Sequence, residues 1–432
     1  MVQTPWGNAD QLRERMLRPG PGMPREVVEK SQRERLFAAT VACVAAKGYE
    51  ATTVADVLEL SGVSRSAFYD HFRDKEECFL ATFEALAAKS MELVDRVLTG
   101  EGPLEERARN AMHGLLELMV DQPAAARLCF CDVYAVGERG RQAVERPMES
   151  FAMVIGEAIG QIRGGEALPD EMVRAVLGGA QLVIQSHLLR DEVDALPKHA
   201  GDLWEWALGY EPPSAPLRLA GRRPPQSTDG EPPFLAFSQA ERIIRALAAV
   251  AFERGYPAVT IADIAARASV SQATFYSYFP DKHAALVAAL DSAGAQMLGV
   301  VMPAARRAPD WPNSIRAAIG ALCAFCAAEP DLAWLTAVEA YSAGSMALEK
   351  RDRIIDEMGA LLAPGFDTAP TTKPIVADAA LRTVWALLHG QIATAGPQDL
   401  PQVAPLASYM VLAPFIGAEQ AVEVSNGDGR GR

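Results

Sequence analysis

The chain has 432 residues, roughly three times the ~150 residues of one typical domain. Half of its residues are hydrophobic and 22% are charged, a balance that excludes wholesale disorder. Its net charge of -14 means that the molecule as a whole repels nucleic acid and anionic membranes. Any DNA binding therefore has to come from a local surface.

The beginning of the chain carries prolines and scattered charges, which predict a disordered arm over residues 1–24 and no signal sequence. The longest uncharged run, Leu400–Ala418, is interrupted by prolines, so no membrane span is expected. Six cysteines are too few for a disulfide framework and fit a reducing compartment. We expect a cytoplasmic protein without membrane association.

The sequence contains one pattern twice. Residues Arg33–Phe79 align without a gap with Ala240–Leu286, at an offset of 207 residues, and the register continues downstream. This predicts a tandem duplication of a whole domain, because the period is far longer than that of a solenoid repeat. The proline-rich stretch 211–236 between the copies predicts an extended linker.

Helical periodicity runs through both copies, and no alternating stretch of useful length predicts a strand. The fold class is therefore predicted as all-α. Near the start of each copy, Thr53 and Thr260 are suitable N-caps for a short helix, and Ser64 and Ser271 for a second one. Two short capped helices separated by a tight turn are typical of a helix-turn-helix whose second helix enters the major groove.

The run from Ser64 to Lys75 resembles the signature of the tetracycline-repressor (TetR) family of bacterial regulators, and the run from Ser271 to Lys282 is similar to it again. The resemblance implies that both runs contact a double-stranded DNA operator. The implied phosphate contacts are Ser64, Tyr69, His71, Lys75, Ser271, Tyr276, Tyr278 and Lys282. The implied base-reading residues are Arg65, Ser66, Ala67, Gln272, Ala273 and Thr274, and the caps Thr53 and Thr260 belong to the same surfaces.

Two positions depart from the family pattern: Leu58 replaces the usual alanine in the first copy, and Ser269 replaces the turn glycine in the second. Neither helix-turn-helix segment is basic. Residues 25–80 hold eight Lys/Arg against ten Asp/Glu, and residues 237–290 hold five against four. This leaves open the alternative of a helical adaptor, or of a redox or ligand sensor, with degenerate DNA-binding domains.

The resemblance also implies a helical ligand and dimerisation domain after each helix-turn-helix. The predicted domains are an arm (1–24), a first helix-turn-helix (25–80), a first ligand domain (81–210), the linker (211–236), a second helix-turn-helix (237–287), a second ligand domain (288–418) and a flexible tail (419–432). We call 25–80 and 237–287 the first and second heads. Family members pair as dimers, so the two halves of this chain are expected to pair as an intrachain pseudo-dimer. A homodimer of whole chains with four heads is the alternative.

The expected function is a sequence-specific repressor, released by a small apolar effector, whose two non-identical heads read two half-sites. The candidate pocket residues are Met119, Cys129, Phe130 and Tyr134 in the first copy and Phe325, Trp334, Tyr341 and Trp385 in the second. Aromatic residues and methionine at helical spacing are more often plain core, so core packing stays the alternative at each position.

Catalytic, metal-binding and cofactor-binding motifs are not evident. The six histidines are scattered, and no phosphate-binding loop or nucleophile elbow occurs. Cys323 and Cys326 have CxxC spacing, but two thiols on one helix face lack the further ligands of a zinc site. We expect neither an enzyme nor a metalloprotein, and no cofactor.

Overall fold

The computed structural model describes residues 2–17, 23–218 and 238–427. The fold class is confirmed as all-α, since the described strands are two residues long each and the rest of the regular structure is helical. Chain contacts divide the molecule into two compact units, one with residues 1–158 and 187–201 and the other with 159–186 and 202–432. The boundary does not fall at the linker, because two late helices of the first copy belong largely to the second unit.

The N-terminal segment of the first unit is ordered in its described part, contrary to the disorder expected for the arm. Strands β1 (Gln3–Thr4) and β2 (Gly7–Asn8) form an antiparallel hairpin, followed by the short helix η1 (Ala9–Gln11). The Trp6 ring packs 5.2 Å from the Phe37 ring, and Leu12 is buried. Apolar contacts with the first head thus fix a segment whose local composition looked disordered; residues 18–22 lie outside the described part.

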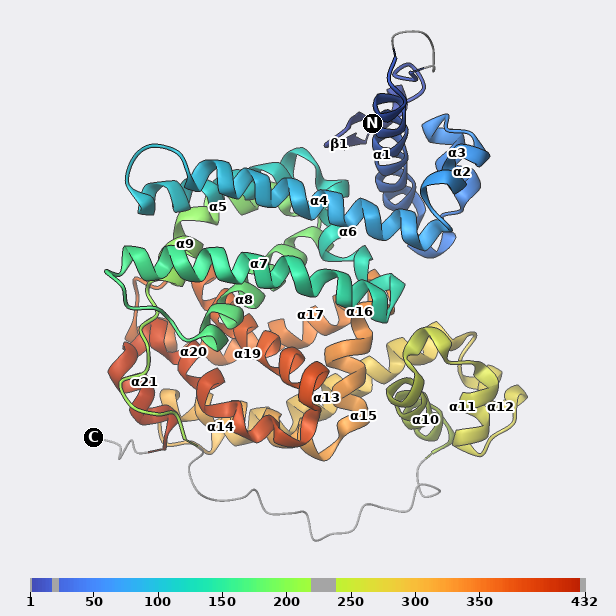
Figure 1. Ribbon diagram of the computed structural model, residues 1–432. Helices are drawn as coiled ribbons and strands as arrows, with labels where there is room; N and C mark the ends of the chain where they lie inside the picture. Colours follow the sequence, from blue (N-terminus) through green and yellow to red (C-terminus); the bar gives the residue numbers. More distant parts are fainter. Residues whose placement is uncertain (1, 18–22, 219–237, 428–432) are drawn as a thin grey trace. The chain divides into compact units, whose positions relative to one another are not determined.

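The first head consists of three helices, and further helices of the first unit follow it (Figure 1). The head helices are α1 (Arg25–Ala51), α2 (Val54–Ser61) and α3 (Arg65–His71). The elements after them are α4 (Lys75–Leu98), α5 (Leu104–Asp121), α6 (Pro123–Phe130), η2 (Asp132–Val136), α7 (Glu138–Ile162) and η3 (Val193–His199).

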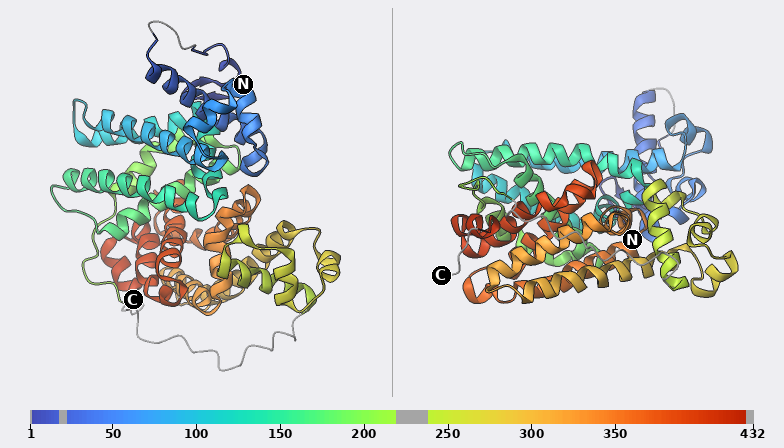
Figure 2. Two further views of the ribbon diagram at one scale, coloured as in Figure 1. Left: turned by 45° about the vertical axis from the view of Figure 1, so that its right-hand side comes forward. Right: turned by 90° about the horizontal axis from the view of Figure 1, so that it is seen from below.

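The second unit begins at Ile159, in the last turn of α7. It then includes two helices of the first copy, α8 (Asp170–Leu189), which belongs to this unit as far as Ser186, and α9 (Ala200–Leu208), which belongs to it from Asp202. The second head has the helices α10 (Gln239–Arg254), η5 (Tyr256–Ala258), α11 (Ile261–Ala268) and α12 (Gln272–Tyr278). Figure 2 shows this head, in olive and yellow, from two further sides. Its core contains Leu247, Ile264 and Phe275, and Leu335 of the following domain packs into the same cluster.

The remaining helices form the ligand domain of the second copy. They are α13 (Lys282–Arg306), α14 (Trp311–Ala328), α15 (Pro330–Trp334), η6 (Leu335–Glu339), α16 (Ala340–Ser342), α17 (Ser345–Gly359), η7 (Ala360–Leu362), α18 (Gly365–Thr368), α19 (Pro374–Ala395), η8 (Pro397–Gln402), α20 (Ala404–Ile416) and α21 (Ala418–Ser425). By length and composition α13 could cross a membrane, a criterion that core helices of soluble proteins also meet. Its face with Ala285, Leu286 and Met297 is fully buried within the described chain.

Two predicted flexible regions have ordered parts. The helix α21 occupies most of the described tail and buries Val422 and Val424, so residues 419–425 are not a flexible tail. At the start of the predicted linker, the backbone N–H of Arg218 donates to the Asn426 side chain at 2.7 Å, and Asn426 donates to the Pro216 carbonyl at 3.2 Å. Residues 219–236 of the linker lie outside the described residues.

Candidate nucleic-acid interface

A glycine that the geometry requires kinks α1 at Gly48 in the first head and follows the end of α10 at Gly255 in the second. Gly48 has a φ of 80° and Gly255 a φ of 76°, a region that side-chain-bearing residues rarely adopt. The turn after each glycine brings Thr53 or Thr260 to the start of the next helix, where both threonines have extended backbones suited to an N-cap. The glycines therefore fix where the helix-turn-helix begins.

Both threonines close a reciprocal capping box. The Asp56 backbone N–H donates to the Thr53 hydroxyl at 3.3 Å, and the Asp56 carboxylate accepts the Thr53 N–H at 2.7 Å. Thr260 and Asp263 make the same pair of bonds, each at 3.2 Å. A hydrogen bond from Lys47 and those from Thr53 hold the pKa of Asp56 well below its usual range. The threonines were predicted as part of the DNA-facing surface; they are exposed, and their hydroxyls bond within the caps.

The turns between the two short helices differ in residue type but share a left-handed backbone. Gly62 has a φ of 66° and Ser269 a φ of 54°. A non-glycine residue in this region costs on the order of 1 kcal/mol. A β-carbon at Gly62 would also lie 3.1 Å from the Arg13 side chain, since Arg13 of the N-terminal segment donates to the Glu59 carbonyl at 2.9 Å. A side chain at Gly62 would thus crowd Arg13 as well as strain the backbone, whereas the second head has serine at the corresponding position.

The second short helix of each head exposes one face and buries the other. The hydroxyl of Ser64 caps α3 by accepting the Ala67 N–H at 3.2 Å, and that of Ser271 caps α12 by accepting the Thr274 N–H at 3.0 Å. Phe68 and Phe275 are fully buried on the inner faces. The exposed side chains on the outer faces are Ser64, Arg65, Ser66, Tyr69, Ser271, Gln272, Ala273, Tyr276 and Tyr278, with Ala67 and Thr274 partly exposed. The predicted base-reading residues therefore share one accessible surface in each head.

The two central tyrosines are held in the same way. Tyr69 is 48% exposed and Tyr276 is 54% exposed. Each ring meets the buried phenylalanine before it edge-on, with centroids 5.3 Å apart for Phe68 and Tyr69 and 5.7 Å apart for Phe275 and Tyr276. This contact fixes the direction of each ring while leaving the face of the side chain accessible, as a phosphate or groove contact requires.

The last residues of α3 and α12 bond back to the first helix of their head. The His71 Nε2 lies 3.1 Å from the Gln32 side-chain oxygen, and the Tyr278 hydroxyl donates to the Gln239 oxygen at 3.3 Å. Burial, with a smaller contribution from Arg33, lowers the pKa of His71. His71 is therefore neutral at physiological pH. It can serve as a hydrogen-bonding group toward a phosphate but not as a fixed cation.

The two predicted phosphate-binding lysines are already engaged by the protein. Lys75 Nζ donates to the Tyr49 carbonyl at 2.9 Å and lies 4.2 Å from the centre of the Tyr49 ring. Lys282 Nζ donates to the Val259 carbonyl at 3.2 Å and lies 4.7 Å from the Tyr256 ring. Each lysine thus ties the start of the fourth helix to the kink after the glycine. The sequence did not indicate this second role, because the acceptors are backbone carbonyls.

Three of the four pocket residues predicted in the first copy line one groove. This groove, of about 250 Å³, lies between α4, α5 and α6 and includes Met119, Cys129 and Phe130. Tyr134 is buried and does not line it. Lys89 and Arg96 contribute cationic groups, and Pro5 of the N-terminal hairpin forms part of the wall. The sequence did not predict that the N-terminal hairpin contributes to this groove, because the hairpin contacts helices that are distant from it in sequence.

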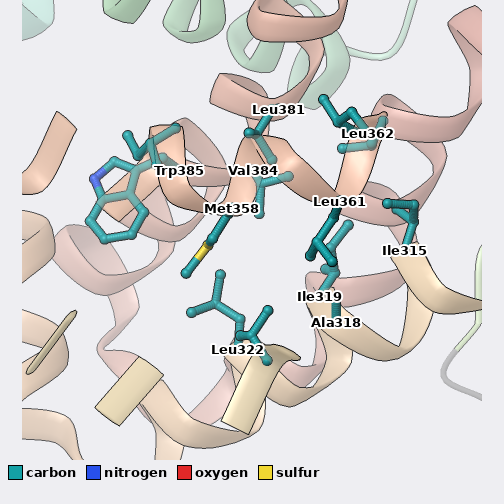
Figure 3. A pocket seen from close by; sticks show the side chains of 13 residues that line it. Ile315, Ala318, Ile319, Leu322, Met358, Leu361, Leu362, Leu381, Val384 and Trp385 are labelled. Carbon is teal, nitrogen blue, oxygen red and sulfur yellow. The ribbon is translucent and has the colours of Figure 1, made fainter. Parts of the chain in front are cut away.

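The second copy contains a small apolar cavity of about 30 Å³, which has room for about one water molecule. Figure 3 shows its lining, to which Trp385 contributes together with aliphatic residues such as Leu322 and Met358. The other three predicted residues lie elsewhere. Phe325 packs against the core of the second head, Trp334 donates to the Glu339 carboxylate at 3.1 Å, and Tyr341 is buried 4.8 Å from the Arg351 guanidinium. The aliphatic lining carried no signal in the sequence beyond helical periodicity.

A buried carboxylate that the sequence did not single out joins the second head to its ligand domain. Glu339 is fully buried and accepts the Tyr256 backbone N–H at 3.0 Å. Tyr256 directly follows the glycine that ends α10. The bond therefore connects the start of the helix-turn-helix to η6 of the ligand domain.

Helices of the first copy contact helices of the second copy within the second unit. A β-carbon at Gly178 of α8 would lie 2.5 Å from the Ala386 β-carbon of α19, so the helices approach closely at this point. The Tyr210 hydroxyl donates to the Met410 carbonyl and the Tyr409 hydroxyl to the Glu211 carbonyl, both at 2.6 Å. The two copies thus share a packed contact that includes a reciprocal pair of hydrogen bonds.

No group of His, Cys, Asp or Glu that could hold a metal ion occurs among the described residues. Cys323 and Cys326 are buried, and burial raises the pKa of Cys326 to about 12 and that of Cys323 further. Thiols of this kind are protonated at neutral pH and react slowly.

Comparison with known proteins identifies both heads. The model of "Bacterial regulatory proteins, tetR family" matches residues 36–82 and again residues 243–290. Both heads are thus similar to the tetR family, and the match occurs twice in tandem along the chain.

Curated relatives of this chain include the HTH-type transcriptional repressor AcnR of Corynebacterium glutamicum, with 37% identity over 87 residues, 20% of this chain and 42% of AcnR. YerO of Bacillus subtilis, an uncharacterized HTH-type transcriptional regulator, is 31% identical over 77 residues, 17% of this chain and 27% of YerO. The chain thus matches less than half the length of these two relatives.

Solved structures give a weaker likeness. The fatty acid degradation regulator FadR of Bacillus halodurans has a TM-score of 0.38 and 18% identity, with 41% of this chain and 95% of that chain covered. FadR of Bacillus subtilis, solved in complex with stearoyl-CoA, has a TM-score of 0.37 and 15% identity, with 40% and 96% covered.

Proposed function

We propose that this protein is a sequence-specific DNA-binding transcriptional regulator that uses both heads. The observation that carries the proposal is the pair of exposed faces on α3 and α12, held by the same set of internal bonds in two copies that are identical at many positions. Exposed Arg or Gln near the start of such a helix supplies donors for base edges in the major groove. The similarity of both heads to the tetR family and the name of the AcnR relative support action as a repressor.

The two heads read different half-sites. Arg65 in the first head has the fork of donors that pairs with the O6 and N7 atoms of guanine. Gln272 in the second head has the amide that pairs with the N6 and N7 atoms of adenine. Ser66 and Ala273 give the neighbouring positions different polarity as well. The operator is therefore expected to be an imperfect inverted repeat, with each half sensitive to its own head.

The two copies pair with each other inside one chain. The close approach of Gly178 to Ala386 and the reciprocal bonds of Tyr210 and Tyr409 support this pairing. Such a pseudo-dimer presents two heads per chain, as a two-fold dimer presents two per pair of chains. A homodimer of whole chains with four heads is the competing assembly, and light scattering at several protein concentrations distinguishes the two.

The effector is a small apolar molecule that binds in the ligand domains. The groove with Met119, Cys129 and Phe130 has the larger free volume, and its lining combines apolar side chains with the charged Lys89, Glu92 and Arg96. A molecule that binds one arrangement of the helices better than the other shifts the heads away from the DNA-compatible spacing.

The test of DNA binding is the enrichment of genomic fragments by purified protein at moderate salt. The double variant Tyr69→Ala/Tyr276→Ala is expected to lose at least about tenfold in fragment retention, because each head loses one fixed groove contact. Met153→Ala, at an exposed position outside both heads, is the matched control. Circular dichroism of each variant shows that the helices are intact.

Unchanged retention by the double variant would contradict the proposal. Absence of retention by the parent chain would favour the adaptor or sensor, an alternative supported by the lack of excess positive charge in both heads.

A further inference from the structure

The contact between α8 of the first copy and α17 and α19 of the second contains a buried polar cluster. Arg382 and Arg351 are both fully buried, as are Gln185 and Ser186 of α8. The Arg382 guanidinium pairs with Asp352, with Asp356 at 3.1 Å and with Asp378 at 2.9 Å. All of these charged groups belong to the second copy, whereas α8 contributes only uncharged groups.

The two uncharged α8 side chains complete the cluster. The Ser186 hydroxyl donates to the Asp352 carboxylate at 2.8 Å, and the Arg382 guanidinium donates to the Ser186 oxygen at 3.2 Å. The Arg351 Nη2 donates to the Gln185 side-chain oxygen. The Nε and Nη1 atoms of Arg351 have no hydrogen-bond partner, so Gln185 is an acceptor that this buried cation can hardly lose. Removal of one partner from a buried charge is strongly unfavourable.

At the offset of the repeat, the second copy has no amide at the position of Gln185. With the offset of 207 residues, Gln185 and Ser186 correspond to Ile392 and Ala393 of α19. Only a shift of this register by one residue would bring an amide, that of Gln391, to the place of Gln185; the opposite shift brings Ala393. In the register of the repeat, a pair of second copies would therefore place an apolar side chain against each Arg351.

We infer that this surface is heterotypic: the α17–α19 face of the second copy accepts α8 of the first copy and rejects a second copy of itself. The cluster makes the correct pairing favourable because α8 supplies an acceptor to Arg351 and a hydroxyl to Arg382 and Asp352, and makes the wrong pairing costly because the buried Arg351 cation loses the Gln185 acceptor. The inference rests on the proposed intrachain pairing and adds its specificity. Tandem duplication alone would leave two similar pairing faces, each able to bind the other copy or a copy of itself. The cluster favours pairing between the two different copies.

The test uses the full chain with a specific protease site inserted after Pro225, purified intact and then cleaved. Native mass spectrometry of the cleaved protein is expected to show one-to-one complexes of the two fragments and no pairs of identical fragments. In the variant Gln185→Leu, the dissociation constant of the two fragments is expected to rise by about 100-fold or more, because the buried Arg351 loses the acceptor that α8 supplies. Glu171→Leu places the same side chain at an exposed position of α8 and serves as the control.

A second variant keeps the test informative if Gln185→Leu folds poorly. Gln185→Glu retains an acceptor oxygen for Arg351 and is expected to hold the fragments as tightly as the parent or more tightly. Parent-like affinity in Gln185→Leu, or pairs of identical fragments from the parent, would overturn the heterotypic contact. Complete separation of the two parent protein fragments would instead overturn the proposed intrachain pairing on which the heterotypic contact rests. The retention of genomic DNA by the intact chain tests DNA binding by the heads independently of the pairing and of the contact.

Discussion

Tyr210 and Tyr409 exchange hydrogen bonds between the two copies: each hydroxyl donates to a carbonyl beside the other tyrosine, at 2.6 Å in both directions. Both side chains are fully buried. Reciprocal bonds of this kind are the mark of an isologous contact, in which the same feature occurs on both sides. Here the two sides lie in one polypeptide.

Replacing these tyrosines by phenylalanine should lower stability unequally. Tyr409→Phe leaves the Glu211 carbonyl without this donor and should cost about 0.5–1.5 kcal/mol. Tyr210→Phe should cost about 1–3 kcal/mol, because the Trp206 indole N–H also loses its acceptor in Tyr210, at 3.0 Å. Urea unfolding measures both values. Tyr278→Phe, at an exposed position, should change stability little, and equal losses in all three variants would contradict the ranking.

A methyl group at Gly178 should separate the copies. The added β-carbon would collide with Ala386 at 2.5 Å, and overpacking of this kind costs about 1–3 kcal/mol. Gly320→Ala is the matched control, since a β-carbon there meets nothing within 4 Å and alanine favours the helix. Thermal unfolding should show a loss for Gly178→Ala and no loss for Gly320→Ala. A neutral Gly178→Ala would mean that the close approach of α8 to α19 does not persist in solution.

The contribution of Asp132 to the stability of the first unit should fall as the pH rises from about 4 to about 6. Burial raises the pKa of Asp132 to about 6 from an ordinary value of 3.8, so the folded chain keeps a proton that the unfolded chain has released. The stabilisation is present at low pH and is lost as the pH passes the folded pKa. Asp132→Asn should therefore be more stable than the parent at pH 7, with a flatter pH profile of unfolding free energy. Asp121→Asn, at an exposed site, should follow the parent profile.

The native thiols should resist a disulfide-exchange reagent at pH 7.5. Burial raises the pKa of Cys326 to about 12 and those of Cys43 and Cys78 to about 11, so little thiolate is present. No disulfide joins any of the six cysteines, which all lie in the described residues, and each should react once the chain is unfolded in urea. Rapid reaction of two thiols in the folded protein would revive the redox sensor as an explanation of the Cys323–Cys326 spacing.

Local features of the site could be predicted from the sequence, and remote ones could not. The caps of Ser64 and Ser271 follow from hydroxyl residues next to short apolar helices, a signal contained within a few residues. The carbonyl partners of Lys75 and Lys282 depend on a kink about 25 residues earlier in the chain, and backbone acceptors leave no trace in side-chain identity. The composition of the N-terminal segment predicted disorder. The structure orders this segment because Trp6 is buried against Phe37, a contact between residues that are distant in sequence.

The pocket predictions show the same limit. Aromatic residues in the second copy were candidates for a cavity lining, yet Trp334 and Tyr341 serve polar contacts with Glu339 and Arg351. Aliphatic residues line the cavity instead, and nothing distinguishes them in sequence from ordinary core positions.

Joining the two copies in one polypeptide changes how the assembled form depends on protein level. Two free subunits assemble in proportion to the square of their concentration, whereas linked halves meet at a fixed local concentration however dilute the cell keeps them. Operator occupancy by such a chain would rise in simple proportion to its abundance. If the two heads read an operator as proposed, a mutation in α3 would alter recognition at one half of the operator and leave the other half unchanged.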